Sequence, residues 1–291
     1  MEGNRDLASS EQELLRAHYP VMMTPERYPL SLVVDIYTRR RAPAVAFVLD
    51  WIQKRGTAPT IFDAGTGFGS ESFLLAAMGA RVLAVDLSAE QVAIAEKRQR
   101  YWEKHFGRDL EIRFEAADLN SYTPSESDLA LTWIASVLAA VPDQDAFLAR
   151  VSDTTQPGGE VMITDMNLLN PLFLWKEWRR RRGGARQSRD FAETKDFRGM
   201  FLRRGRRGAR YFDTTDGEAF DDAQFFWWRT LGALFRSTGF EPHTLEYSGF
   251  VPPLAGAPDL SFLEGVLCRI PIVRSGAYFY RMSAVKTESS G

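Results

Sequence analysis

Residues 60–69 read Thr-Ile-Phe-Asp-Ala-Gly-Thr-Gly-Phe-Gly, an apolar run followed by an acid and by three glycines at alternate positions. Ile61 and Phe62 are typical of a buried strand, and the residues from Ser70 onward have the apolar spacing of a helix. Glycines between a strand and a helix indicate a tight turn, because they adopt backbone angles that other residues avoid. The N–H groups of such a turn and helix start face a ligand. The segment therefore predicts a ligand site in an α/β fold.

A second acid follows the next apolar run, residues 81–86. This acid, Asp86, lies 21 residues after Gly65, which is about the spacing at which a second-strand carboxylate reaches ribose hydroxyls. Asp63, beside the glycines, favours a cationic group such as an ammonium over a pyrophosphate. The spacing Gly-x-Gly-x-Gly also differs from the dinucleotide pattern Gly-x-Gly-x-x-Gly. A nucleoside-containing ligand with a cationic group is therefore predicted, and a dinucleotide is a weaker alternative.

Residues 58–167 resemble the class I S-adenosylmethionine-dependent methyltransferases. The resemblance is carried by the glycine-rich stretch 62–69, by Asp86, by the stretch 115–119 and by the Pro-Gly-Gly turn at 157–159. It implies a Rossmann-like, seven-stranded, mostly parallel sheet with helices on both faces, plus a helical substrate cap. It also implies that Asp86 binds the ribose and that Asp118 contacts the adenine amino group. The cofactor is then S-adenosyl-L-methionine, held by Asp63, Gly65, Gly67, Gly69, Asp86, Leu87, Asp118, Leu119 and Trp133.

The loop after the fourth expected strand, residues 132–140, lacks the ionisable side chains that many members of this family carry there. Substrate chemistry therefore cannot be carried over from that loop. Trp133 is expected to wall the cofactor or the substrate, with packing in the core as the alternative. Asp165, at the end of the fifth expected strand, is the candidate general base, because the acceptor has to lose a proton if its nucleophile carries one. The alternative is an acid that stabilises a turn.

The composition is that of an ordinary globular protein. The 291 residues, 45% of them hydrophobic, suit one α/β domain with insertions and a packed core. The single cysteine, Cys268, excludes an internal disulfide and a multi-cysteine metal site, so no metal is expected. The N-terminal residues have no secretory signal, and no apolar run is long enough to span a membrane. We expect a cytoplasmic protein.

Strands and helices are expected to alternate through the middle of the chain. The expected strands cover 60–63, 81–86, 111–115, 128–132, 159–165, 241–247 and 277–285. A short helix is expected to begin near residue 10. Further helices are expected over residues 32–37, 44–54, 70–78, 89–105, 143–152, 225–237 and 261–270, and residues 39–43 are expected to separate the first two of these. This order divides the chain into an N-terminal helical cap (1–57), a cofactor-binding core (58–166), a cap insertion (167–228) and a C-terminal completion of the sheet (229–291) with its own insertion (249–276).

The cap insertion holds a basic segment, residues 179–210. It contains 12 arginines and one lysine against three acids, a local net charge of +10, whereas the rest of the chain carries −12. We expect this segment to be a lid that holds an anionic group of the acceptor or meets an anionic lipid surface. A solvated mobile surface and a nucleic-acid groove are the alternatives. The expected substrate residues of the caps and of the fifth strand's end are Tyr19, Tyr28, Asn167, Arg203 and Arg204. For the two tyrosines, packing under the N-terminal helices is the alternative.

These features together predict a methyltransferase that acts on a small-molecule acceptor, an apolar molecule with an anionic group of the natural-product, isoprenoid or lipid type. An RNA or protein methyltransferase is the alternative within the same fold. A non-catalytic nucleoside-binding or interaction module is the alternative from another class, and the intact glycine turn with both acids counts against it. No stable nucleic-acid partner is expected, and peripheral contact with a membrane is a further partner to test.

Overall fold

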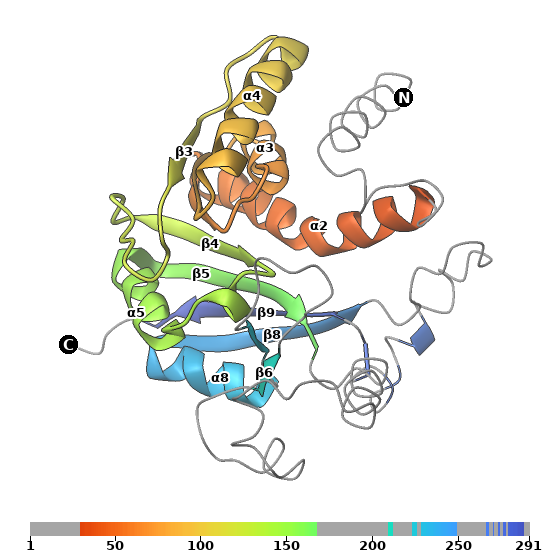
Figure 1. Cartoon of the computed structure of the whole chain (residues 1–291), viewed down its shortest axis with the longest axis vertical. Coiled ribbons are helices and arrows are strands. Elements are labelled where there is room, and N and C mark those ends of the chain that lie inside the picture. The colour runs from red at the N-terminus through yellow and green to blue at the C-terminus, as the bar shows by residue number, and fades with distance from the viewer. Residues whose placement is uncertain are drawn as a thin grey trace.

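Seven strands form one sheet at the centre of the computed structural model, in the order β3-β2-β1-β4-β5-β9-β8 (Figure 1). The structure describes residues 30–167, 209–211, 223–225, 228–248, 266–267, 270, 273, 276–277 and 279–287. The strands of the sheet are β1 (Thr60–Ala64), β2 (Arg81–Asp86), β3 (Ile112–Ala116), β4 (Leu129–Ala135), β5 (Thr155–Met166), β8 (Phe240–Ser248) and β9 (Phe279–Lys286). Two short strands, β6 (Ala209–Tyr211) and β7 (Ala223–Phe225), pair antiparallel in a second sheet.

The strands from β3 to β5 are parallel, and β9 is the strand that runs against its neighbours. This arrangement confirms the predicted seven-stranded, mostly parallel, Rossmann-like sheet. The carboxyl ends of β1, β2, β3, β4 and β5 lie on one edge of the sheet, because these strands share one direction. Ligands of open α/β sheets bind at that edge, and we call it the carboxyl edge.

Helices cover both faces of the sheet (Figure 1). On one face lie α2 (Leu30–Arg55), α3 (Ser70–Ala77) and α4 (Ala89–Phe106); on the other lie the one-turn helix η1 (Leu138–Ala140), α5 (Gln144–Thr154) and α8 (Trp228–Ser237). The apolar core is accordingly divided into two clusters. The cluster under α2, α3 and α4 includes Val48, Phe73, Trp102 and Trp133.

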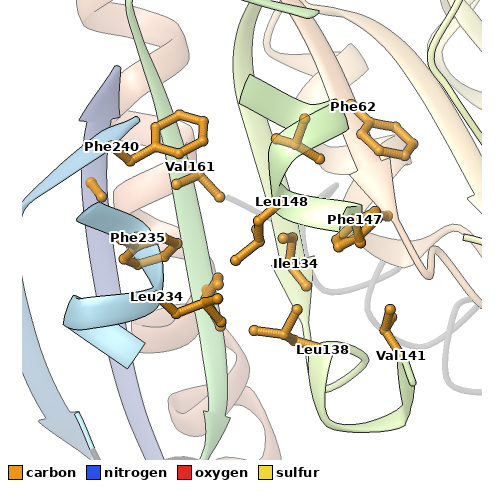
Figure 2. Packing of buried hydrophobic residues seen from close by; sticks show 14 of the residues in the cluster. Phe62, Ile134, Leu138, Val141, Phe147, Leu148, Val161, Leu234, Phe235 and Phe240 are labelled. Atoms are coloured by element: carbon orange, nitrogen blue, oxygen red, sulfur yellow. The ribbon is translucent and has the colours of Figure 1, made fainter. Parts of the chain in front are cut away.

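The second cluster joins β1, β4 and β5 to α5 and α8 (Figure 2). Figure 2 shows Leu148 of α5 between two groups: Val161 of β5 with Leu234 and Phe235 of α8 on one side, and Phe147 of α5 with Phe62 of β1 on the other. Each fully buried side chain of this size stabilises the fold by about 1.5–3 kcal/mol through its removal from water. The apolar strands are thus held from both sides, which fixes the positions of their carboxyl ends.

Several predicted boundaries were wrong. The expected break over residues 39–43 is absent, because α2 runs unbroken through Pro43 from Leu30 to Arg55. Proline in a helix interior costs about 3 kcal/mol, and burial of Ala44, Val48 and Trp51 against the first cluster offsets that cost. The fourth strand extends to Ala135, three residues further than expected.

In the later part of the chain, the observed helices differ less from the predicted ones. The helix expected over residues 225–237 is α8, which begins three residues later, at Trp228. Residue 225 itself is the last residue of β7. The helix expected over 261–270 falls mostly outside the described residues, and so does the helix expected near residue 10. Among the helices that the structure describes, none is both long and apolar enough to cross a membrane.

Candidate functional site

The turn between β1 and α3 contains the three glycines. Gly67 has a φ of 56°, in the left-handed region, and a Cβ added to it would meet only the end of the Gln91 side chain, at 3.3 Å. Gly65 has a φ of 76°, and its Cβ would lie 2.6 Å from a methyl group of Val137, so the loop after β4 closes directly on this glycine. Gly69 caps the start of α3. The Gly67 position is therefore the open part of the turn, where backbone faces a ligand.

Asp86, at the end of β2, lies beside this turn. Its carboxylate accepts hydrogen bonds from the N–H of Gly67 at 2.9 Å and from the N–H of Ser88 at 2.9 Å. A carboxylate has about four acceptor positions, so the half-buried Asp86 can accept ribose hydroxyls as well. Leu87, the next residue, is 74% exposed. An apolar side chain held in solvent beside a carboxylate forms a surface on which an adenine ring can pack.

The stretch after β3 reaches the same edge. Ala117 donates its N–H to the backbone oxygen of Asp86 at 2.9 Å, which places Asp118 and the buried Leu119 next to the end of β2. Asp118 is exposed, and its Oδ1 accepts from the backbone N–H and the side-chain amide of Asn120. Arg150 of α5 braces this stretch with hydrogen bonds to the backbone oxygens of residues 119, 120 and 122. The structure therefore brings the predicted ribose and adenine residues together.

Asp63, at the other side of the turn, is 1% exposed. Ser72 of α3 donates a hydrogen bond to its Oδ2 at 2.5 Å, and the Thr66 hydroxyl lies 3.0 Å from that of Ser72. Burial, and after it the charge of Glu71, raise the pKa of the Asp63 carboxyl from 3.8 to about 7. The hydrogen bonds from Ser72 and Thr66 and the charge of Arg41 act in the opposite direction. Asp63 thus gains or loses a proton near neutral pH, according to the charge placed beside it.

This pKa predicts a pH dependence of cofactor affinity. Below about pH 7 the free protein holds a proton on Asp63, and a bound ammonium group favours the ionised form, so binding must release that proton. We expect the affinity for S-adenosylmethionine to rise about tenfold per pH unit from about pH 5.5 to about pH 6.5 and to level off above about pH 7. Calorimetry in two buffers of different ionisation enthalpy measures the proton release.

Asp63→Asn is the matched control, since it should flatten this profile. The stability of the free protein should change in the opposite direction. It should fall as pH rises from about 4 to about 7, because the native state keeps a proton that the unfolded carboxyl has lost. Equal cofactor affinity of the unsubstituted chain at about pH 5.5 and about pH 7, with no proton released, would contradict an ammonium group next to Asp63.

Arg98 of α4 supports the glycine turn, and the sequence analysis did not identify it. It is buried, and its Nη1 donates hydrogen bonds to the backbone oxygen of Phe68 and, at 3.0 Å, to the hydroxyl of Ser70. Its guanidinium lies 5.1 Å from the centre of the Phe73 ring. An arginine on the buried face of a helix is a sign of such a structural contact, but the partner lies 28 to 30 residues away in the chain. Arg98 therefore fixes α4 to the glycine turn.

Trp133 does not lie beyond the end of β4 as expected. It is fully buried inside that strand and packs in the first cluster, so in this structure it forms core rather than a wall of the site. The residue at the end of β4 is Ser136, which is exposed and has a φ of 58°. Its N–H donates to the backbone oxygen of Thr164 on β5 at 2.8 Å. Because its side chain is fully buried, Trp133 is not part of the proposed cofactor site.

Asp165 is the charged member of a row of side chains across three strands. It is paired in register with Tyr280 of β9, and Tyr280 is paired in turn with Tyr247 of β8. Asp165 and Tyr280 are buried, and Tyr247 is half-buried. Burial, Asp165 and Tyr247 together raise the pKa of the Tyr280 hydroxyl well above its usual value, so that this phenol stays protonated. The hydroxyl has no hydrogen-bond partner within the described part of the chain.

The predicted substrate residues are either engaged in a structural contact or outside the described part of the chain. Asn167 is buried, and its amide donates to the backbone oxygen of residue 277 at 2.9 Å, which ties the end of β5 to the segment before β9. Tyr19, Tyr28, Arg203 and Arg204 lie outside the described residues, as does most of the basic segment. Within the described ranges, no group of three or more His, Cys, Asp or Glu residues is arranged to hold a metal ion.

Comparison with known proteins adds to this geometry. Residues 57–197 match a sequence family described as a methyltransferase domain. The arsenite methyltransferase of Aquipseudomonas alcaligenes is 29% identical over 111 residues, which cover 36% of this chain and 32% of that protein. The ubiquinone biosynthesis O-methyltransferase of Xylella fastidiosa is 30% identical over 129 residues, which cover 43% of this chain and 50% of that protein. The chain therefore matches half or less of the length of these relatives.

A solved structure shares the fold over a larger part of the chain. The crystal structure of an S-adenosylmethionine-dependent methyltransferase from Methanosarcina mazei superposes with a TM-score of 0.54 and covers 79% of this chain and 93% of that protein. The two sequences are 18% identical, a level at which the likeness concerns the fold alone.

Proposed function

We propose that this chain transfers a methyl group from S-adenosylmethionine to a small-molecule acceptor, and the premise of the proposal is that residues 57–197 match a methyltransferase domain family. The observation that carries the proposal is the hydrogen bond from the Gly67 N–H to the Asp86 carboxylate. It places the open glycine turn, which suits the methionine part of the cofactor, next to the acid that suits its ribose. Leu87 and Asp118, at the same edge, suit its adenine.

The residues of the turn fit this cofactor on independent grounds. A Cβ at Gly67 would point into open space apart from one flexible side chain. A ligand can therefore approach the backbone closely at this position only because glycine has no Cβ. Asp63 and Asp86 lie on the two sides of the turn, and carboxylates at these positions suit a ligand that carries an ammonium group and ribose hydroxyls. A dinucleotide would instead place the charge of a pyrophosphate beside Asp63.

The acceptor would lie at the carboxyl edge between β4 and β8, where the row of Asp165, Tyr280 and Tyr247 ends. A buried hydroxyl without a partner costs about 1–3 kcal/mol, and a catalytic role is one of the reasons for which proteins keep such a group. Tyr280 meets this description within the described residues. The aromatic faces of the two tyrosines and the buried carboxylate favour an acceptor with an apolar body and a hydrogen-bonding nucleophile.

The reaction requires few catalytic groups from the protein. When bound, S-adenosylmethionine supplies a methyl group already activated by the sulfonium. The protein has to align the acceptor for in-line displacement and to take up a proton if the nucleophile carries one. Asp165 would accept that proton at its carboxylate, and Tyr280, neutral because of its raised pKa, would hold the acceptor by a hydrogen bond.

The curated relatives support the small-molecule class. One is named an arsenite methyltransferase and the other a ubiquinone biosynthesis O-methyltransferase, and both names are those of enzymes of small-molecule chemistry. An apolar acceptor with an anionic group would also give a role to the basic segment 179–210. A transfer assay tests this proposal: the purified chain is incubated with S-adenosylmethionine and fractions of a small-molecule extract, and mass spectrometry seeks compounds that gain one methyl group. Methylation of added RNA or protein, with no small molecule modified, would overturn the acceptor class.

Replacement of Asp165 by asparagine tests its proposed role. We expect the kcat for the acceptor found in that assay to fall about 10²- to 10⁴-fold, the usual contribution of a general base. Cofactor affinity should not change, because Asp165 lies on β5, two strands from the glycine turn on β1. Glu160→Gln is the matched control on the same strand, since Glu160 lies five residues before Asp165, further from the carboxyl edge, and contacts His243. Unchanged kcat in Asp165→Asn would leave Asp165 as a structural acid.

A further inference from the structure

A buried arginine follows the tyrosine of the proposed acceptor site. Arg281 comes directly after Tyr280 in β9 and is paired in register with Thr164 of β5 and Glu246 of β8. Because successive side chains of a strand point to opposite faces, Arg281 lies on the face under α2, α3 and α4, with Met162 of β5. Thr164 is two residues before the end of β5, so Arg281 lies within about 7 Å of the carboxyl edge along the strand.

Among the described residues, the Arg281 guanidinium has one ion-pair partner. Its Nη2 donates to Oε2 of Glu246 at 2.5 Å, and the Arg281 side chain is 10% exposed whereas that of Glu246 is 63% exposed. The Nε of Arg281 is buried and has no hydrogen-bond partner in the same part of the structure. A guanidinium has five N–H donors in a planar fork. Arg281 therefore has a donor that lacks both water and an acceptor.

The exposed carboxylate of Glu246 does not compensate for the burial of this cation. Burial lowers the pKa of the Arg281 guanidinium, and the charge and the hydrogen bond of Glu246 offset that effect only in part. Arginine stays charged in proteins, so a further anion would stabilise the buried charge. A carboxylate that lies mostly in water forms a weak ion pair, and Glu246 can therefore be displaced readily.

We propose that Arg281 is an oxyanion site, at which a carboxylate or phosphate group of a small molecule takes the place of Glu246. The Nε–H and the Nη2–H lie along one edge of the guanidinium, and Glu246 engages only the Nη2–H. A carboxylate or a phosphate matches that edge with two parallel hydrogen bonds. The acceptor is the expected source of the group, and in that respect the inference rests on the proposed function. It places the acceptor's anionic group on β9 rather than in the basic segment 179–210.

Small anions test this site before the acceptor is known. Benzoate and phenyl phosphate carry an oxyanion on an apolar ring, inorganic phosphate is a free ion, and benzyl alcohol has the ring without the charge. Binding of each to the full chain is measured by calorimetry at constant ionic strength. We expect Arg281→Gln to weaken the two charged aromatic probes about ten- to a hundredfold, as for the loss of hydrogen bonds to a charged group. Binding of benzyl alcohol should stay within about twofold.

Glu246→Gln should have the opposite effect. It removes the carboxylate that competes for the guanidinium, so we expect both charged aromatic probes to bind about two- to fivefold more tightly, the equivalent of one exposed ion pair. Arg281→Lys keeps the charge but loses the planar fork, so its loss should be smaller than that of Arg281→Gln. Arg236→Gln and Glu241→Gln are the charge-matched controls, because these two residues form an exposed pair at 3.1 Å between α8 and β8. Neither control should change the binding of any probe.

The proposal requires the two partners of one ion pair to act in opposite directions. A pair that only holds β8 against β9 would give losses in both variants or no change in either, and any result without opposite changes overturns the proposal. If Arg281→Gln fails to fold in a thermal melt, Arg281→Lys and the exposed Glu246→Gln still decide the question. Inorganic phosphate that binds as tightly as phenyl phosphate would keep the oxyanion site and overturn the acceptor as its source.

Titration of the same samples with S-adenosylhomocysteine separates this inference from the proposed function. A chain that binds the anions through Arg281 and does not bind S-adenosylhomocysteine would keep the oxyanion site and contradict the proposed function. A chain that binds S-adenosylhomocysteine, with unchanged anion affinity in Arg281→Gln, would overturn this inference alone.

Discussion

Replacement of Gly67 by valine should abolish binding of S-adenosylmethionine while the sheet stays folded. The backbone of Gly67 has a φ of 56°, and a β-branched residue at such an angle costs about 1–2 kcal/mol. The added side chain would project from the open part of the turn into the space that a ligand must enter. We expect the affinity for S-adenosylhomocysteine to fall more than about a hundredfold, measured by calorimetry, since a blocked site loses several contacts at once.

Gly158→Val is the matched control for strain. Gly158 has a φ of 72° and no neighbouring atom within 4 Å of an added Cβ. It lies in the first half of β5, where the pairing with β4 is irregular, away from the carboxyl edge. Both variants should lose similar thermal stability, and Gly67→Val alone should lose ligand binding. Normal binding by Gly67→Val would mean that the glycine turn is not the cofactor site.

Replacement of Asp86 by alanine should weaken the cofactor nearly as much. The carboxylate would make charge-assisted hydrogen bonds to two ribose hydroxyls, each worth about 1.5–3 kcal/mol. It also accepts the N–H groups of Gly67 and Ser88, so its loss should loosen the turn itself. The expected loss of affinity for S-adenosylhomocysteine is about 10²- to 10⁴-fold in a calorimetric titration.

Asp86→Asn separates these two effects. The amide oxygen can still accept one of the two backbone N–H groups, so the turn should keep more of its stability than in Asp86→Ala. Its affinity for the ligand should be intermediate, because a neutral acceptor forms weaker hydrogen bonds than a carboxylate. Equal affinity of Asp86→Ala and the unsubstituted chain would exclude Asp86 from the ribose site.

The glycine turn and Asp86 could be predicted from the sequence because their signals are local. Strand, glycines and helix start occupy one stretch of consecutive residues, and the second acid ends the next strand. Parallel strands bring their carboxyl ends to one edge whatever the rest of the chain does. The hydrogen bond between Gly67 and Asp86 is the structural result of that rule, and the predicted sheet was confirmed with it.

Long-range contacts could not be predicted in this way. Arg41 of α2 forms an ion pair with Glu71, 30 residues away, and the row that joins Asp165 to Tyr280 depends on the register of an antiparallel strand from the far end of the chain. Neither partner can be identified without the tertiary structure. The same limit explains α2, where Pro43 indicated a break and burial of the surrounding apolar residues kept the helix whole. Trp133 likewise looked like a residue of the strand end because β4 is longer than its apolar run suggested.

The most direct test of the cofactor site is a parallel calorimetric titration of the full chain with S-adenosylhomocysteine and with NAD. The geometry around Gly67, Asp86 and Asp63 predicts binding of S-adenosylhomocysteine at one site per chain, lost in Asp86→Ala, and no binding of NAD. Binding of NAD with no response to S-adenosylhomocysteine would contradict it, because the glycine turn would then hold a pyrophosphate beside Asp63.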